Sequence, residues 1–310
     1  MDMSEQFTTA QQEELEPLLE LTPALTQKRR SQGRIIFDRF VRNRAAIIGA
    51  VFLVFLFLLC FLGPLFWRID PTALNFDATF SPPTLAHPFG TDNLGHDELA
   101  RAMSGGQVSL QVGIFSMLIG MVLGISIGAF AGYYGGIVDN LLMRLTDVAL
   151  SIPLYLLLFV LSVAFTDHTP RSVITLIAVF SWTYAARLVR GEFLGLRERE
   201  FVLAARTIGA RNLRLMFRHI LPNAVGPIIV NATLLIGTNI IIESVLSFFG
   251  FGIQPPAASW GNMITDGQGF FETAPWLVLA PALLICLTVL SVNLVGDGLR
   301  DALDPRMTER

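Results

Sequence analysis

The sequence predicts an all-α polytopic membrane protein with six membrane-spanning helices. Of its 310 residues, 53% are apolar and only 15% are charged, and the mean hydropathy is +0.58. A soluble domain carries about a quarter charged residues, so this composition favours a chain surrounded by lipid. The apolar residues also gather in long runs, and a helix that crosses a bilayer needs about 20 of them.

Four of the predicted spans are apolar runs without a charged residue: 45–67, 108–132, 148–165 and 276–295. A fifth run, 224–250, is long enough but contains Glu243. The sixth, 172–186, is shorter and continues into Arg187. Together these runs give six crossings, which place both ends of the chain on one side of the membrane.

The basic residues predict which side faces the cytoplasm, because Lys and Arg in short loops remain there. With a cytoplasmic N-terminus, 19 of the 22 basic residues are cytoplasmic, and only Arg68, Arg101 and Arg171 are external. We therefore expect both termini to be cytoplasmic. The predicted segments are the tail 1–44, the first span 45–67, the external loop 68–107, a core 108–300 with five spans and the cytoplasmic loop 187–223, and the C-terminus 301–310.

The two ends and the external loops carry little recognisable chemistry. Residues 1–27 hold six acidic side chains and no basic one, which is typical of a disordered or loosely helical tail. Cys60 and Cys286 lie within apolar runs, as buried thiols do. His87 and His96 lie in the external loop without a third ligand nearby, so no metal site is predicted.

The chain also lacks the sequence of a nucleotide-binding loop. Its only lysine is Lys28, whereas a P-loop needs a lysine after its glycines to reach the phosphates. We therefore expect no cofactor in this chain. ATP and Mg²⁺, if they drive its work, would be bound by partner subunits.

The stretch EFVLAARTIGARNLRLMFRHILPN, residues 200–223, is patterned as two short amphipathic helices. Two sets of residues at i, i+3, i+4 and i+7 predict one apolar face each: Phe201, Ala204, Ala205 and Ile208, then Leu213, Met216, Phe217 and Ile220. Gly209 separates the helices as a left-handed helix end, and Pro222 is expected to close the unit.

Such a segment can lie on the inner leaflet, with its arginines on anionic lipid. Ala204 and Ala205 are smaller than the residues that a lipid-binding face prefers. Small side chains allow close approach to another protein, so the pattern favours docking into a groove of a partner.

The same segment resembles the cytoplasmic loop of inner-membrane permeases of binding-protein-dependent ABC importers. In that motif, E-A-A is followed by three residues, G, nine residues and I-x-L-P. Ala204, Ala205, Gly209, Leu221 and Pro222 match at the same spacing. Leu203 stands where the motif has Glu, and His219 where it has Ile.

Further stretches resemble the dipeptide, oligopeptide and nickel permeases, in particular their C-type subunit. They are FGTDNLGHDELARAMSGGQVSL, YYGGIVDNLLMRLTDVALSIP, ESVLSFFGFGIQPPAASWGNM, NLVGDGLRDALDPR and the approach to the first span, RFVRNRAAIIGAV. Together they cover most of residues 40–306. His96 replaces the usual Arg of the external motif.

The resemblance implies a type I ABC importer permease in the bacterial cytoplasmic membrane. Its expected partners are a homologous B-type permease subunit, two ABC ATPase subunits that bind ATP and Mg²⁺, an external or periplasmic substrate-binding protein, and membrane lipid. No nucleic acid is expected. The implied cargo is peptide, with nickel, glutathione or another small solute as alternatives.

The resemblance also implies roles for named residues. The ATPase-coupling residues would be Phe201, Ala204, Ala205, Arg206, Ile208, Gly209, Arg211, Leu221 and Pro222. Asp92, Asp97 and Trp260 in the external motifs are the expected contacts of the binding protein.

Two further features lie inside the spans. Ser116, Gly120, Gly124, Gly128 and Gly132 recur every four residues, which favours close helix packing over a role in lining the pathway. An intramembrane acid such as Glu243 is by default a candidate functional residue, although near the outer end a structural hydrogen-bond network is favoured over a substrate ligand or proton carrier.

Two other classes of protein are alternatives to an importer permease: a secondary transporter or channel, and a hydrolase. A secondary transporter or channel would need ion-coupling acids at mid-membrane, and Glu243 is the only candidate within the predicted spans. The G-x-S-x-G match around Ser126 lies mid-span with no histidine in any span, which disfavours a hydrolase. No catalytic residue is predicted.

Overall fold

The computed structural model describes residues 32–164 and 167–304, which contain helices and no β-strand beyond one isolated bridge between Thr91 and Asp97. The predicted all-α class is therefore confirmed for these residues. Residues 1–39 and 40–310 form two units. Helix α2 (Gln32–Arg42) begins in the first, and everything below concerns the second. The acidic tail 1–27 and Phe165 lie outside the described residues.

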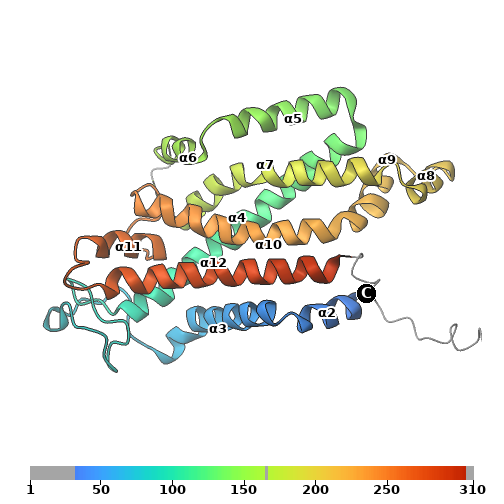
Figure 1. Ribbon diagram of the computed structural model, residues 1–310. Coiled ribbons are helices and arrows are strands. Elements are labelled where there is room, and N and C mark those ends of the chain that lie inside the picture. The colour runs from blue at the N-terminus through green and yellow to red at the C-terminus, as the bar shows by residue number, and fades with distance from the viewer. Residues whose placement is uncertain (1–31, 165–166, 305–310) are drawn as a thin grey trace, which may run out of the picture. The chain divides into compact units, whose positions relative to one another are not determined.

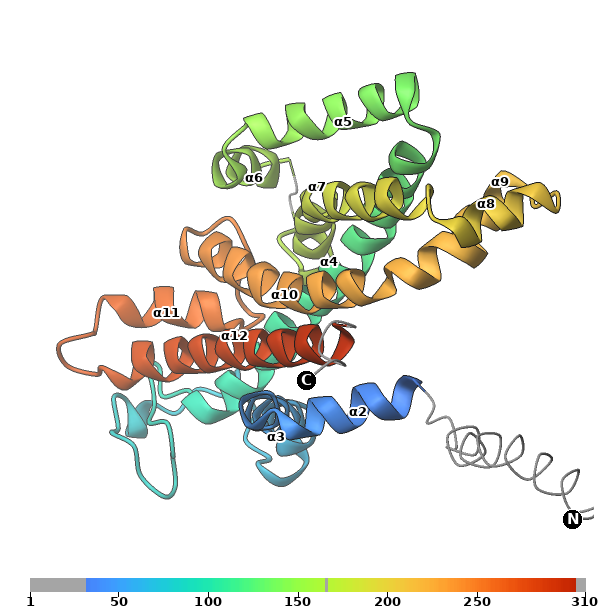
Figure 2. The same cartoon turned by 45° about the vertical axis from the view of Figure 1, so that its right-hand side comes forward.

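Among the described residues, five helices are long and apolar enough to cross a membrane. They are α3 (Arg44–Phe66), α4 (Glu98–Tyr134), α7 (Pro170–Leu196), α10 (Leu221–Phe248) and α12 (Trp276–Leu303). In Figures 1 and 2, α3 lies against α12, α12 lies against α10, and α10 lies against both α4 and α7. Helix α10 therefore lies in the middle of the bundle, because it contacts α12 as well as α4 and α7.

The predicted span 148–165 is wrong as a straight helix. The structure has α5 (Gly136–Ser151) and α6 (Leu154–Ser162), bent by 83° at the break between them. Ile152 is extended there (φ −91°, ψ 131°), a conformation favoured before proline because the proline ring clashes with a helical backbone at the preceding residue. Pro153 therefore breaks the span, and a sixth crossing exists only if the bent pair counts as one.

Two spanning helices are longer than the apolar runs predict. Helix α4 begins at Glu98 instead of residue 108, because the Asp97 carboxylate accepts the backbone N–H of Ala100 over 2.7 Å as an N-cap. Helix α7 begins at a Thr169 cap and continues to Leu196, past the predicted end at residue 186. In both cases the helix extends beyond the apolar run into polar residues of the predicted loop.

Close packing of α4 on α7 depends on the predicted row of small residues. A methyl group added at Gly124 would lie 2.5 Å from the Ala185 Cβ, and one added at Gly132 would lie 2.7 Å from the Arg190 carbonyl oxygen. Gly120 and Gly128 are crowded by α7 in the same way, and Ser116 donates to the Ile174 carbonyl oxygen over 3.1 Å. The row therefore lies in the α4–α7 interface, where backbones approach closely.

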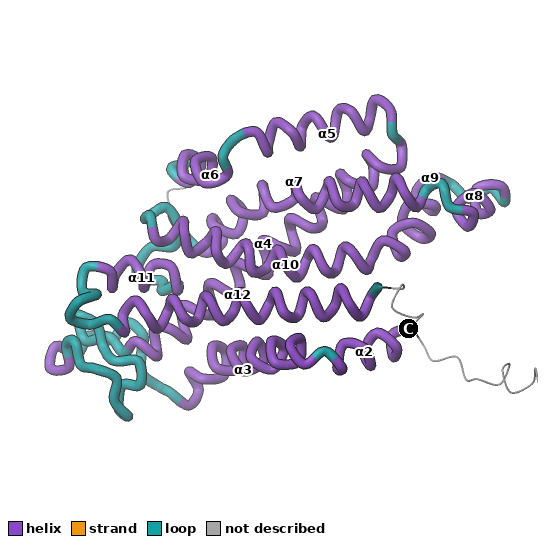
Figure 3. The backbone as a smooth tube through the Cα atoms, in the orientation of Figure 1, coloured by secondary structure: helices purple, strands orange, loops and turns teal. Residues whose placement is uncertain are grey.

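The connecting segments gather at opposite ends of the bundle (Figure 3). One end carries the loop before α4 and the short helix α11 (Trp260–Gln268). The other carries α8 (Glu200–Thr207) and α9 (Asn212–Arg214). Helix α11 lies in a predicted loop, although the sequence signals it: Ser259 and Asn262 form a capping box.

Candidate functional site

The candidate site is the segment between α7 and α10, where the sequence predicts a docking knob. Arg199 is extended (φ −73°, ψ 147°) and sets α8 off from the end of α7. After α8 the chain turns at Gly209, whose φ of +85° is the left-handed conformation expected there. No neighbouring atom would touch a side chain at Gly209, so backbone conformation, not space, favours glycine.

The predicted apolar face of α8 is wrong at Ala205, which faces inward while the other three residues of that face are exposed. Val202 and Ala205 are buried, Ala205 being only 6% exposed, and they belong to the same core cluster as Leu215, Met216 and Ile220. The other three residues of the predicted face are exposed: Phe201, Ala204 and Ile208. The second predicted face divides in the same way: Met216 and Ile220 are buried, whereas Leu213 and Phe217 are exposed. Spacing alone could not show which apolar residues hold the two helices together.

The exposed apolar side chains form what we call the knob surface: Phe201, Leu203, Ile208, Leu213 and Phe217. Ile208 is 86% exposed, although it lies next to the turn at Gly209. Arg206 and Arg211 are exposed on the same segment. Grouped exposed apolar side chains beside charged ones are typical of a protein interaction site.

Pro222 does not close the unit, contrary to the sequence prediction. Helix α9 continues through a π-helical turn, Leu215–Ile220, directly into α10, where Pro222 lies in the first turn. The Leu221 N–H bonds to the Met216 carbonyl oxygen in the wider π pattern. A proline lacks the N–H for a normal turn and its ring needs room, and the π turn next to it accommodates both. The second half of the knob is therefore a continuous extension of α10.

Polar contacts fix the base of the knob to the rest of the bundle. The Tyr133 hydroxyl at the end of α4 donates to Asn212 Oδ1 over 2.9 Å. Arg197 donates to the Gly132 carbonyl oxygen over 3.2 Å. These bonds join the end of α4 to both sides of the segment that carries the knob.

Two ion pairs join α5 to α7 near the same end. Arg190 donates two hydrogen bonds to the Asp139 carboxylate, at 2.5 and 2.6 Å. Asp147 pairs with Arg187 over 2.7 Å, whereas its spacing in the sequence favoured Arg144. A bidentate guanidinium–carboxylate pair fixes direction as well as distance, so Arg190 orients α5 against α7.

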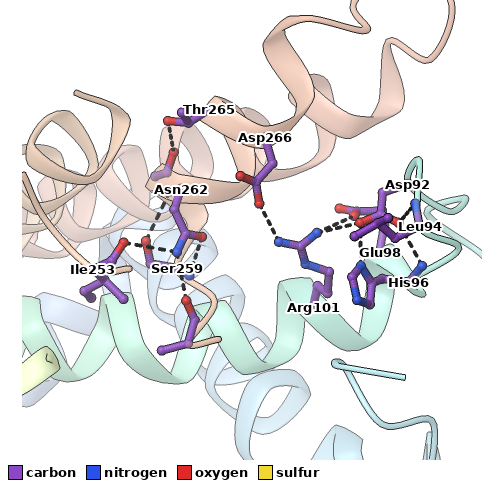
Figure 4. Close-up of polar contacts among 12 residues, drawn as sticks. Asp92, Leu94, His96, Glu98, Arg101, Ile253, Ser259, Asn262, Thr265 and Asp266 are labelled. Atoms are coloured by element: carbon purple, nitrogen blue, oxygen red, sulfur yellow. Dashed lines mark hydrogen bonds and ion pairs between the residues drawn. The ribbon is translucent and has the colours of Figure 1, made fainter. Parts of the chain in front are cut away.

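At the opposite end of the bundle, Asp92 and Asp97 are buried and already have partners. Asp92 is 5% exposed and takes hydrogen bonds from Arg101 Nη1 and the backbone N–H groups of Leu94 and His96. Arg101 also contacts Asp266 of α11 over 2.6 Å, as Figure 4 shows. The external motif therefore ties the loop to α4 and α11.

All three residues that were predicted to contact a binding protein are buried in the structure. Asp97 is 2% exposed, caps α4 and accepts the Trp67 indole N–H over 3.0 Å. Trp260 is fully buried, and its indole N–H donates to the Ala102 carbonyl oxygen over 2.9 Å. These three side chains lie beneath the surface at this end of the bundle and stabilise it through hydrogen bonds.

Glu243 is fully buried at the outer part of α10. Its carboxylate accepts the hydroxyl groups of Ser109 over 2.9 Å and Ser247 over 2.7 Å. Ser109 in turn accepts the Trp260 N–H, and Ser247 accepts the Ile253 N–H. The acid is thus the centre of a network that joins α4 and α10 to the start of α11.

The described residues contain no group of three or more His, Cys, Asp or Glu side chains that could hold a metal ion. His87 lies 2.7 Å from Asp97, and His96 lies 2.7 Å from Asp92. Each loop histidine is therefore engaged with a separate carboxylate.

Two protein families match the chain. Residues 124–309 match the binding-protein-dependent transport system inner membrane component. Residues 31–83 match the N-terminal TM domain of oligopeptide transport permease C. Between them, the two matches include α3, the knob and α12.

Several curated proteins are similar over most of their length. The oligopeptide transport system permease protein OppC of Escherichia coli (strain K12) is 40% identical over 287 residues, which is 91% of this chain and 95% of that protein. OppC of Bacillus subtilis (strain 168) is 38% identical over 272 residues, 87% and 88% respectively. The dipeptide transport system permease protein DppC of Alkalihalophilus pseudofirmus is 39% identical over 277 residues, 89% and 91%.

Among solved structures, an inward-facing conformation of the MetNI methionine ABC transporter is similar to this fold. The TM-score is 0.54 at 20% sequence identity, and the match covers 66% of this chain and 96% of the other. At that identity the similarity concerns the fold alone.

Proposed function

Because this chain belongs to the family of binding-protein-dependent transport system inner membrane components, we propose that it is the permease subunit of an ABC importer that moves di- and oligopeptides across the bacterial cytoplasmic membrane. Partner ATPase subunits would bind the ATP and Mg²⁺ and supply the driving force. The chain itself would be a transporter subunit and no enzyme.

The observation that carries this proposal is the knob surface. Five apolar side chains are exposed at the end of the bundle, on a segment that is held in shape from its other side by Val202 and Ala205. An apolar face on a rigid support fits a groove of a partner protein. We assign this groove to an ATPase subunit, with Phe201 and Ala204 of α8 and Ile208 directly after it as the side chains that enter it.

The same geometry gives a route for the motion. The core cluster fastens α8 to the π turn, and the π turn continues into α10 without a break in the helix. A displacement of α8 would therefore be passed to α10, in the middle of the bundle. Rigid helices that move as units are a known basis of switching between two states.

The remaining partners follow from the family. A substrate-binding protein would deliver the cargo on the external side, and a homologous B-type permease subunit would complete the pathway. The arginine distribution supports cytoplasmic termini, and the knob and the external loops lie at opposite ends of the bundle, as that orientation requires.

Peptide cargo is favoured by the relatives, whose names specify oligopeptide and dipeptide transport. Nickel and glutathione are the competing cargoes that the first resemblance left open. Uptake by the assembled importer of a labelled tripeptide, labelled glutathione and labelled nickel would separate them, and we expect uptake of the tripeptide.

Docking of the knob is tested by site-specific crosslinking in the full complex. In a Cys286→Ser background, which removes the exposed native thiol, Ile208→Cys places a thiol on the knob surface. We expect a bifunctional thiol crosslinker to join it to an ATPase subunit. Leu85→Cys is the matched control, because Leu85 is fully exposed in the external loop. Equal crosslinking at both positions, or none at Ile208→Cys, would reject the proposal.

A further inference from the structure

Two cavities lie along the same faces of α7 and α10. The first, of about 190 Å³, is enclosed by α7, α10 and the α5–α6 bend at Pro153, and Ser181 and Asn239 are among its lining residues. The second, of about 500 Å³, lies nearer the knob between α7, α10 and the end of α12, and includes Glu192 and Asn231.

The lining positions repeat at helical spacing from one cavity to the other. On α7 they are residues 177, 181, 184, 188 and 192, and on α10 they are residues 227, 231, 234, 238 and 242, with Asn239 beside this row at the first cavity. Steps of three and four residues keep to one face of a helix. The two cavities therefore belong to one strip of the α7–α10 surface.

Each cavity contains an asparagine with an unpaired amide atom. Within residues 32–164 and 167–304, two buried side-chain atoms have no hydrogen-bond partner, Asn239 Nδ2 and Asn231 Oδ1. Asn239 is fully buried, and its side chain has one hydrogen-bond partner, the Ser181 hydroxyl, 3.0 Å from Asn239 Oδ1.

The Ser181 contact cannot satisfy the Asn239 amide in either orientation. The same hydroxyl lies 2.9 Å from the Ile177 carbonyl oxygen, and it has one proton to donate. If the amide is turned, Nδ2 donates to Ser181 and Oδ1 is left without a partner. A buried polar group without a partner is costly, so this side chain is prepared for a ligand with a complementary donor or acceptor.

The spacing of the two asparagines suits a peptide main chain. Eight positions separate them on α10, which at 1.5 Å per residue is about 12 Å. An extended chain advances about 3.3 Å per residue, so about four residues would span the strip. Each peptide group offers one donor and one acceptor, which are the two kinds of partner that the amides lack.

The cavity volumes fit a ligand that is bound partly in the first cavity and partly in the second. Small-molecule sites are typically about 300–1,000 Å³, so the first cavity alone is too small for a whole oligopeptide. It has room for one peptide group with a small side chain, and the larger second cavity for the rest.

We propose that this strip of α7 and α10 binds the main chain of the transported peptide, with Asn239 and Asn231 bonding to peptide groups about four residues apart as the helices move apart during transport. The inference rests on the proposed peptide transport. Recognition through the main chain is independent of side chains, so the strip would bind peptides of different sequences.

The test measures uptake by the complete importer in liposomes, with a hexapeptide, which is long enough to reach both asparagines, and its depsipeptide analogue. The ester of the analogue lacks one N–H and has a weaker carbonyl acceptor. Asn239→Leu keeps the volume but removes the amide. We expect its KM for the hexapeptide to rise about two- to tenfold, the effect of one neutral hydrogen bond, with kcat unchanged. We also expect the variant to lose the discrimination between peptide and depsipeptide that the unaltered importer makes.

Asn293→Leu is the matched control, because Asn293 is an exposed asparagine of α12 that lines neither cavity. Asn231→Leu repeats the test in the second cavity, and decides it if Asn239→Leu does not assemble. Unchanged KM and discrimination in the variants would mean that water or the partner permease satisfies the amides, and would overturn the inference. If the unaltered importer takes up no peptide at all, the proposed function fails instead.

Discussion

The Tyr133 hydroxyl donates a hydrogen bond to Asn212 Oδ1 over 2.9 Å, which ties the C-terminal end of α4 to the first turn of the helix that becomes α10. Tyr133 is buried, whereas Tyr134 beside it is exposed. This single bond therefore joins the base of the knob surface to a different spanning helix.

Tyr133→Phe removes this bond and keeps the ring. We expect the free energy of unfolding in detergent to fall by about 0.5–1.5 kcal/mol, the net contribution of one such hydrogen bond. Thermal unfolding of the purified complex measures the effect. Tyr134→Phe is the control, since its ring contacts with Phe130 and Tyr133 need no hydroxyl. Equal losses in the two variants would contradict this assignment.

Ala205→Leu and Ala204→Leu separate the buried and exposed sides of α8. A leucine at the buried Ala205 overpacks the contact with the π turn, and we expect a loss of about 1–3 kcal/mol. At the exposed Ala204 the same change should leave stability unchanged and weaken co-purification of the ATPase subunits. Denaturant titration and pull-down of the complex give the two readouts, and a reversed pattern would show that the faces are misassigned.

How far the sequence predicted this segment depends on the level of structure. The spacing of Phe201, Ala204 and Ile208 correctly indicated a helix, and Gly209 correctly marked its end. Which apolar residues face inward was not readable, because Leu215 and Met216 come from the neighbouring turn and bury Ala205. Pro222 suggested a helix end, and only the π turn before it explains why the helix continues.

Gly128→Val tests the close approach of α4 and α7. An added Cβ would lie 2.8 Å from the Val189 Cβ, so the two helices must separate. We expect a destabilisation of about 1–3 kcal/mol, typical of overpacking, measured by thermal unfolding of the complex. Gly191→Ala is the control, since no neighbour would touch the new methyl group. A stable Gly128→Val variant would exclude close helix packing as the role of this row.

Arg101→Met tests the buried charge network at the outer end. Removing the guanidinium leaves the buried Asp92 without its arginine and with His96 as its remaining side-chain partner, for which the expected cost is about 3–5 kcal/mol. Limited proteolysis of the loop 68–97 measures the loss, and we expect faster cleavage. Arg68→Met, an exposed arginine in the same loop, should behave as the unaltered protein does. Slow cleavage in both would show that Arg101 does not hold the loop.

The outer end also shows where sequence reasoning fails. Asp92, Asp97 and Trp260 stand out in the external motifs, and a polar or aromatic residue in a loop suggests an interaction surface. Each is buried because its partner, such as Arg101 or the Ala102 carbonyl oxygen, comes from α4. The apolar runs located the spans, but they did not show that polar residues lengthen α4 and α7 or that the chain bends by 83° between α5 and α6.

The most direct test of the account measures ATP hydrolysis and peptide uptake by the reconstituted importer in which Phe201 and Ile208 are both replaced by serine. Both side chains are exposed, so the fold should keep its unfolding temperature. We predict that uptake is lost because the knob no longer engages the ATPase. Uptake at the unaltered rate would contradict the claim that the knob surface carries the motion.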